Sequence, residues 1–413
     1  MTSQAPESDS PTSEHETPAG PSSTRDGLRV YLAIPLTLLL FNMAFFLPRN
    51  MLTNYMTLHD LGRWSGLVLA ILPLMTLLLA VPVGLLGDRF SPKRLAVIGL
   101  SLLVAFTALF FFHRGEPTLT MLVAAFIVGG AAAAVGDSSL RPLYLKCIGH
   151  RRQALKLALL STAPMLGFGG SAFLGGLAAR HLGWNLDQQF RLAFPMAIAA
   201  LAVSLVMKDA QPTPFSLAAY RASLMRRKVL VYMAVVFVNA MHFGTEAVCI
   251  APYVKDHLGM GDAGAGDYFG LIAVAMTITG AASAAIRDRG ANRHRMWTLG
   301  LLFSAVFNVA SVLVASPAWF FGIRIGHVVA DAIMLNAALR IVATLFPRNR
   351  VGGPMGLSAL VSTCGVLVGT LVSNEIRIAG FIPTAWQLPA PFILAGAAVL
   401  TILVVQRLMK ERF

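Results

Sequence analysis

Two apolar stretches of the chain each carry ionisable side chains at helical spacing. In each stretch three polar residues are separated by steps of three and four: Asn239, His242 and Glu246 in the first, and Arg324, His327 and Asp331 in the second. Because residues three and four apart lie on the same face of an α-helix, each stretch forms one polar stripe. Imidazole and carboxylate groups can exchange protons, and a guanidinium pairs with carboxylates or other anions.

Three interpretations of these stripes are open. In the first, Glu246 or Asp331 binds and releases protons, and Arg324 pairs with the empty carboxylate or holds an anionic substrate. In the second, four side chains are ligands of a transported metal ion: His242, Glu246, His327 and Asp331. In the third, a buried arginine–aspartate pair simply joins two helices. We favour proton coupling, and we expect no cofactor and no resident metal ion.

The composition indicates the elements that must position these stripes. The chain has 413 residues, of which 56% are apolar and 13% charged, and its mean hydropathy is +0.69. Soluble domains contain about 25% charged residues, and one helical membrane span needs roughly 20 apolar residues. We place twelve such spans, at residues 29–52, 65–86, 95–113, 118–141, 155–180, 188–207, 228–253, 267–287, 296–315, 318–341, 352–378 and 388–406. Alternation of the kind that a β-barrel needs is absent, so the prediction is an all-α membrane protein.

The distribution of charge predicts the orientation of these spans. The net charge is +14, and all but eight of the 33 lysines and arginines fall on one side of the predicted membrane. An excess of basic residues marks the cytoplasmic side, which places both termini in the cytoplasm and the chain in the cytoplasmic (inner) membrane. The basic character therefore reflects orientation, and we expect no nucleic-acid partner. The three cysteines have no metal-ligand spacing and form no disulfide framework.

Polar segments divide the chain into predicted regions. Residues 1–27 are rich in Ser, Thr, Pro and Glu, and we predict a disordered cytoplasmic tail there. Residues 208–228 carry five basic side chains and form a predicted cytoplasmic linker. The linker separates an N-terminal six-helix half, residues 28–207, from a C-terminal six-helix half, residues 229–413.

Short charged motifs occur in both halves at matching places. GLLGDRFSPKRL at 84–95 is repeated, 200 positions later, by AAIRDRGANRHR at 284–295. DSSLR at the end of the fourth span likewise corresponds to NAALR at the end of the tenth, with an offset of 199. Such internal repeats are typical of secondary transporters, in which the substrate site lies near the membrane midplane at the interface of the repeats.

The first repeated motif resembles the signature of the major facilitator superfamily, G-x-x-x-D-R-x-G-R-R/K between spans two and three. Ser91 and Pro92 replace the second glycine and first arginine, and Ala284 replaces the glycine of the second copy. The resemblance implies twelve helices in two pseudo-symmetric halves, transport by alternating access, and a cytoplasmic latch. An acid on a neighbouring helix end, Asp137, is in the right layer to pair with the basic side chains. The latch residues are then Gly84, Asp88, Arg89, Lys93, Asp137, Arg141, Asp288, Arg289 and Arg293.

The resemblance stops at the superfamily. The fifth span is rich in glycine but lacks the Gly-Pro pair of antiporters, and the arginine expected near Ala125 in the fourth span is missing. Two places are open for Arg49 and Asn50, at the outer end of the first span: the mouth of a cavity or the layer of lipid headgroups. Asn308, in the ninth span, is interpreted as an interhelical hydrogen-bonding residue.

We therefore predict a monomeric secondary transporter that moves a small organic solute, with protons and the lipid bilayer as its other partners. No phosphate-binding loop is present, and no nucleophile–base pair indicates an enzyme. We favour proton-coupled export by antiport, because this function is common in the family that the chain resembles. Uptake of an organic or anionic nutrient by proton symport is the alternative. A different class, a sensor or scaffold with a transporter fold, is also open.

Overall fold

The apolar stretches form the long helices of the structure, a computed structural model that describes residues 27, 29–89, 91–147, 153–210, 226–288, 292–345 and 352–409. The helices of the first half are α2 (Ile34–Leu58), α3 (Ser65–Arg89), α4 (Pro92–Phe112), α5 (Leu119–Ala132), α6 (Ser138–Cys147), α7 (Gln153–Leu182), α8 (Leu186–Arg191) and α9 (Ala193–Leu205). Those of the second half are α11 (Arg227–Pro252), α12 (Gly261–Asp288), α13 (Arg293–Ser311), α14 (Pro317–Leu345), α15 (Gly352–Ile378), α16 (Thr384–Gln387) and α17 (Pro389–Leu408). Short π-helical or 3₁₀ segments adjoin several of them, at Arg29–Ala33, Gly62–Trp64, Ala133–Asp137 and Tyr253–His257.

These helices follow the predicted spans closely. Within the described residues, ten helical segments are long and apolar enough to cross a membrane, and no strand occurs. The helices α7 and α13 occupy the positions of the other two predicted spans. The predicted tail at 1–27 lies outside the described residues except for Gly27, as does the part of the predicted linker at 211–225.

The departures from the family motif have a local explanation at the start of α4. The Ser91 side chain accepts a hydrogen bond from the backbone N–H of Arg94, at 3.0 Å, and Pro92 occupies the first helical turn. Serine is a favoured N-cap, and proline at the first position lacks only an N–H that would have no helical partner. In the second copy Asn292 caps α13 in the same way, by accepting from the backbone N–H groups of His294 and Arg295. Both repeated loops therefore end in a helix-start signal.

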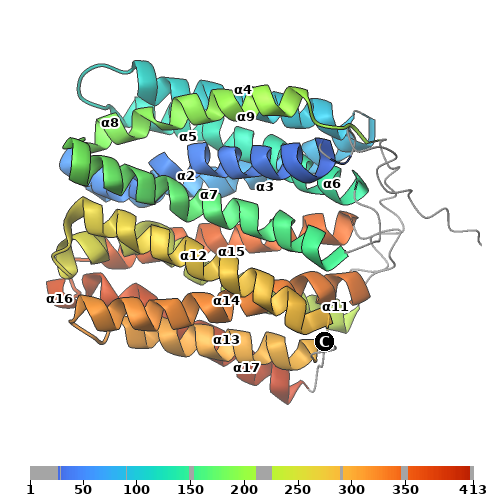
Figure 1. Ribbon diagram of the computed structural model, residues 1–413. Helices are drawn as coiled ribbons and strands as arrows, with labels where there is room; N and C mark the ends of the chain where they lie inside the picture. The colour runs from blue at the N-terminus through green and yellow to red at the C-terminus, as the bar shows by residue number, and fades with distance from the viewer. Residues whose placement is uncertain are drawn as a thin grey trace, which may run out of the picture.

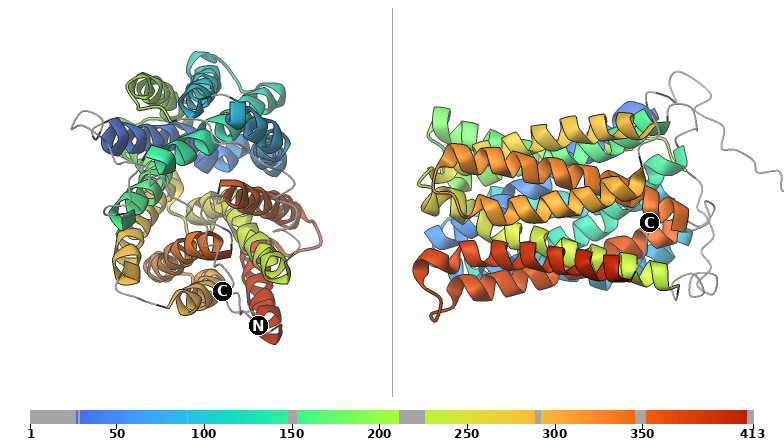
Figure 2. Two further views of the ribbon diagram at one scale, coloured as in Figure 1. Left: turned by 90° about the vertical axis from the view of Figure 1, so that its right-hand side faces the viewer. Right: turned by 90° about the horizontal axis from the view of Figure 1, so that it is seen from below.

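The helices run side by side in two groups. In Figure 1 those of residues 29–205 occupy the upper part of the bundle and those of residues 227–408 the lower part. Figure 2 shows the same division in the view along the helices. Two helix pairs make the largest contacts between the groups, α7 with α12 and α3 with α15. We call the end at which α9 ends and α11 begins the linker end, and the other the far end.

Glycines allow the closest approach between the two groups. A Cβ atom added to Gly169 of α7 would lie 2.0 Å from the carbonyl oxygen of Phe269 on α12. A Cβ at Gly66 of α3 would lie 2.2 Å from the Cβ of Asn374 on α15. Small residues at such positions let helix backbones touch inside a membrane. The glycine-rich composition of the fifth span thus serves the α7–α12 contact.

Candidate functional site

The two polar stripes face each other, one on α11 and the other on α14. The Arg324 guanidinium donates to Oε1 of Glu246, and Nε2 of His327 lies 3.0 Å from the same oxygen. One turn further along α14, Oδ2 of Asp331 lies 3.3 Å from Nε2 of His327 and 3.2 Å from Nε2 of His242. The structure therefore joins five of the six predicted residues into one chain of contacts. We call His242, Glu246, Arg324, His327 and Asp331 the charged network.

Every nitrogen of Arg324 has a protein partner. Its Nε donates to the hydroxyl of Tyr268 on α12 and its Nη1 to Oδ1 of Asn308 on α13, both at 2.8 Å. With Glu246 on α11, this one side chain ties three neighbouring helices to α14. Only 1% of the Arg324 side chain is exposed, so in this conformation it is a structural centre rather than a free anion-binding group. Tyr268 is a partner that sequence reasoning missed, because one tyrosine in an apolar span gives no signal.

The two histidines are held in a defined tautomer by the backbone. Nδ1 of His242 contacts the carbonyl oxygen of Asn239, and Nδ1 of His327 lies 2.8 Å from the carbonyl oxygen of Ser304. A carbonyl oxygen only accepts hydrogen bonds, so each Nδ1 carries the proton. Each Nε2 then faces a carboxylate oxygen, and such a contact needs a further proton on the nitrogen or on the oxygen. The charged network thus has two contacts between an imidazole nitrogen and a carboxylate oxygen that each need a proton.

Two buried side-chain oxygens near Asp331 have no hydrogen-bond partner in the described part of the chain. Oδ1 of Asp331 and Oδ1 of Asn239 have no hydrogen-bond donor among the described residues. The amide nitrogen of Asn239 points only to Sδ of Met334, at 4.0 Å. A buried carboxylate oxygen without a donor is costly. The Asn239 side chain therefore lies beside the network without bonding to it, and only the backbone carbonyl oxygen of Asn239 contacts His242.

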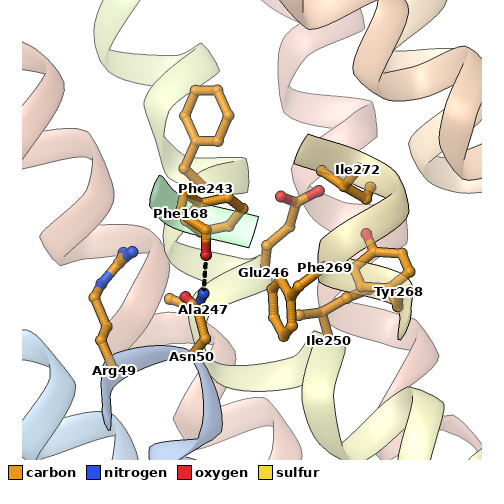
Figure 3. A pocket seen from close by; sticks show the side chains of 10 residues that line it. All are labelled: Arg49, Asn50, Phe168, Phe243, Glu246, Ala247, Ile250, Tyr268, Phe269 and Ile272. Carbon is orange, nitrogen blue, oxygen red and sulfur yellow. Dashed lines mark hydrogen bonds between the residues drawn. The ribbon is translucent and has the colours of Figure 1, made fainter. Parts of the chain in front are cut away.

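A cavity between the two halves adjoins the network at Glu246. Its volume is about 70 Å³, and it is lined by Arg49, Asn50, Phe168, Phe243, Glu246, Ala247, Ile250, Tyr268, Phe269 and Ile272. Figure 3 shows the Glu246 carboxylate on one side of Phe168 and Asn50, and Arg49 on the other. The sequence left Arg49 and Asn50 open, and the structure places both at this cavity. Pockets for drug-sized ligands measure roughly 300–1,000 Å³, so the cavity must widen to admit a substrate of that size.

The three ligand-type side chains His242, Glu246 and His327 could approach one metal ion. Their nearest donor atoms lie within 4.8 Å of one another. The Glu246 oxygen, however, already accepts from Arg324. A metal ion bound to Glu246 would therefore lie next to the positive charge of the Arg324 guanidinium. The donor set therefore suits an ion-pair and proton network better than a cation site.

Few of the predicted latch side chains lie in the described part. Arg141 is described, as a partly buried residue of α6. Outside the described part lie Arg289, the surroundings of Gly84, and the side chains of Asp88, Arg89, Asp137, Asp288 and Arg293. Lys93 is described, and its Nζ donates to the carbonyl oxygens of Leu205 and Met207, at 2.7 and 2.8 Å. Its backbone N–H donates to Oδ1 of Asp209 at 3.2 Å. Lys93 thus binds the end of α9, within its own half.

The comparisons with known proteins agree with this architecture. The sequence model of the Major Facilitator Superfamily matches the chain twice, over residues 33–291 and 232–412. The chain belongs to the major facilitator superfamily. The predicted family and the predicted all-α membrane fold are confirmed, and membership indicates a multi-pass membrane transporter rather than an enzyme. No curated protein sequence matches the chain.

Solved structures of this superfamily share the fold. A crystal structure of the peptide transporter POT in complex with sulfate has a TM-score of 0.73 at 15% identity, over 92% of this chain and 94% of that one. A point mutant of the peptide transporter POT has a TM-score of 0.70 at 14% identity, over 91% and 93% of the two chains. At such identities the likeness concerns the fold alone.

Proposed function

We propose that this chain is a proton-coupled secondary transporter of a small organic solute, and that the charged network is its proton site. The supporting observation is the pair of imidazole Nε2 atoms that face carboxylate oxygens, with both Nδ1 atoms committed to backbone carbonyls. Ionisable side chains inside spans are costly and commonly mark proton pathways. A purely structural arginine–carboxylate pair needs neither histidine.

Glu246 is the entry point for protons in this proposal. It is the network residue that lines the cavity, and 20% of its side chain is exposed, compared with 3% or less for the other four. A proton that binds Glu246 removes the negative charge that Arg324 pairs with. Because Arg324 ties α14 to α11, α12 and α13, the loss of this pair weakens contacts among four helices. Proton binding is thereby linked to a change in helix packing.

Contacts at the far end indicate which side of the cavity is closed. Asn54 of α2 donates to Asp262 of α12 at 2.9 Å, and Arg180 of α7 pairs with Asp267 of α12. Arg377 of α15 donates to the carbonyl oxygen of Gly62 at 2.8 Å. All three contacts join the two halves. With the predicted cytoplasmic termini, the far end faces outward, and this conformation is closed to the outside.

For an anionic solute, charge balance favours symport over antiport. The site contains two arginines, Arg49 and Arg324, and two carboxylates, Glu246 and Asp331, so each proton that the network binds adds one positive charge. A solute that is attracted by this charge loads together with the proton rather than in exchange for it. The prediction of export by antiport depends on family frequency and has no comparable observation behind it.

The test uses the full chain in proteoliposomes with a pH-sensitive dye inside and an imposed pH gradient. We expect at least one solute of a broad panel to cause proton flux, and Glu246→Gln and Asp331→Asn to abolish it. The matched control is Glu375→Gln, since Glu375 is an exposed carboxylate of α15 that does not line the cavity. Solute flux that is unaffected by the gradient and by both network variants would contradict proton coupling. A panel in which no solute moves would favour the sensor or scaffold class.

A further inference from the structure

Arg49 introduces a positive charge at the cavity from the N-terminal half. It belongs to α2 and lines the cavity, and its Cζ atom lies 4.9 Å from the centre of the Phe46 ring. No carboxylate among the described residues pairs with it. Arg49 is partly buried, and a guanidinium that is partly withdrawn from water beside an apolar cavity is costly unless an anion compensates it. In the described part of the chain, Arg49 is therefore a cation that contacts an aromatic ring but has no carboxylate partner.

Glu246, the acidic residue of the cavity lining, is already engaged. Its Oε1 accepts from Arg324 and contacts His327, and the view in Figure 3 separates it from Arg49 by Phe168 and Asn50. The Asn50 amide is fixed by donating to the carbonyl oxygen of Phe168 at 2.8 Å. The positive charge at the α2 side of the cavity thus stays uncompensated while the network is intact.

The apolar part of the cavity lining is largely aromatic. Phe46 and Phe168 meet edge to face with ring centres 5.0 Å apart, and Phe168 meets Phe269 in the same way at 5.6 Å. Phe243, Ile250 and Ile272 complete the apolar lining. Such a surface binds an apolar body, preferably a ring, through area burial and edge or face contacts.

We propose that this cavity binds a small organic monoanion with an aromatic or branched apolar body, whose anionic group lies on Arg49. The proposal rests on the proposed transport function and names its substrate class. Proton uptake by the network makes the site more positive, so anion and proton strengthen each other's binding, as thermodynamic linkage requires. A cationic amine of the same shape would meet Arg49 without compensation, because Glu246 is occupied by Arg324.

The test measures binding of benzenesulfonate to the purified full chain by calorimetry, at acidic and at alkaline pH. The charge of this probe does not change with pH, so any pH dependence belongs to the protein. We expect saturable binding that is tighter at acidic pH and stronger than that of neutral benzamide or cationic benzylamine. Loss of one charged hydrogen-bonding group costs about tenfold or more in affinity, and we expect that loss for Arg49→Gln and its recovery in Arg49→Lys.

The matched control is Arg63→Gln. Arg63 also lies over an aromatic ring, that of Trp64 at 5.0 Å, but it is exposed and lines no part of the cavity. The Arg63→Gln variant should leave benzenesulfonate binding unchanged. Unfolding temperatures of the Arg49 variants equal to that of the unaltered protein would show that these variants are folded. Unaltered affinity in Arg49→Gln, preference for benzylamine, or no saturable benzenesulfonate binding would each overturn the inference.

Failure of the inference and failure of the proposed function give different results. Arg49-dependent binding without pH dependence, together with absent proton flux, retains the anion site and rejects proton coupling. Proton flux that depends on Glu246, together with binding that ignores Arg49, retains proton coupling and rejects the anion site.

Discussion

His327 of α14 lies with its Nε2 atom 3.0 Å from Oε1 of Glu246 on α11, while its Nδ1 is held 2.8 Å from the carbonyl oxygen of Ser304 on α13. This one imidazole therefore fixes the positions of three helices and presents a protonatable nitrogen to a carboxylate. The same oxygen of Glu246 accepts from Arg324. A structural role and a proton-binding role are thus carried by one set of contacts, and the predictions below separate them.

The Glu246–Arg324 pair should be strongly coupled in stability. Removal of one partner of a buried pair leaves an uncompensated charge and typically costs about 3 kcal/mol or more. We expect Glu246→Gln and Arg324→Gln each to lower the unfolding temperature in detergent. The decrease in the double variant should be clearly smaller than the sum of the decreases in the two single variants. Additive losses in this double-mutant cycle would mean that the two side chains do not depend on each other.

Gly169 and Gly170 are neighbours on α7 and should respond oppositely to alanine. A Cβ at Gly169 meets the Phe269 carbonyl oxygen at 2.0 Å, whereas a Cβ at Gly170 meets nothing within 4 Å. Overpacking costs about 1–3 kcal/mol, while alanine gains up to about 1 kcal/mol of helix propensity over glycine. We expect Gly169→Ala to lower the unfolding temperature and the transport rate, and Gly170→Ala to leave both unchanged or raise stability. Equal behaviour of the two variants would show that α7 and α12 do not approach each other at this point.

Arg377 should hold the far end closed. Its Nη2 donates to the Gly62 carbonyl oxygen and the Ser65 hydroxyl, at 2.8 and 2.9 Å, and thereby ties α15 to the start of α3. We expect Arg377→Ala to lengthen and broaden the distance between spin labels at Asp60→Cys and Gly380→Cys, with the native cysteines replaced. The exposed neighbour Glu375→Gln serves as the control. An unchanged distance distribution in Arg377→Ala would show that this contact does not restrain the far end.

Lys93 should contribute to stability as a helix cap. A cation that donates to the last carbonyl oxygens of a helix is favoured there by the free acceptors and by the helix dipole. We expect Lys93→Met to cost about 1–2 kcal/mol in unfolding free energy, through the contacts with Leu205 and Met207. Arg94→Met, at an exposed neighbouring position, should cost much less. A variant that lost transport but no stability would instead support the latch role that the family resemblance implies.

Hydropathy and spacing were sufficient for the helices and for the two stripes. Apolar runs of sufficient length must be helical in a bilayer, because no water is present there to form hydrogen bonds with the backbone. Ser91 and Pro92 mark the start of α4, as an N-cap residue and a first-turn proline. The steps of three and four place His242 with Glu246, and Arg324 with His327 and Asp331, on single faces. The membrane span count and the all-α class follow from the same information.

What only the tertiary structure decided is how those faces are turned. A helix that is apolar on all sides can pack against lipid or against other helices with any of its faces. Composition therefore does not determine how such a helix is rotated about its own axis. Packing set that rotation, and with it the choice of Tyr268 and Asn308 as partners of Arg324 and the place of Arg49 at the cavity. Contacts between residues far apart in the chain cannot be read from local periodicity. The sequence by itself therefore determined the membrane helices and which polar side chains share a face. The fold decided that these faces meet, and that Arg49, which has no carboxylate partner among the described residues, lines the adjoining cavity.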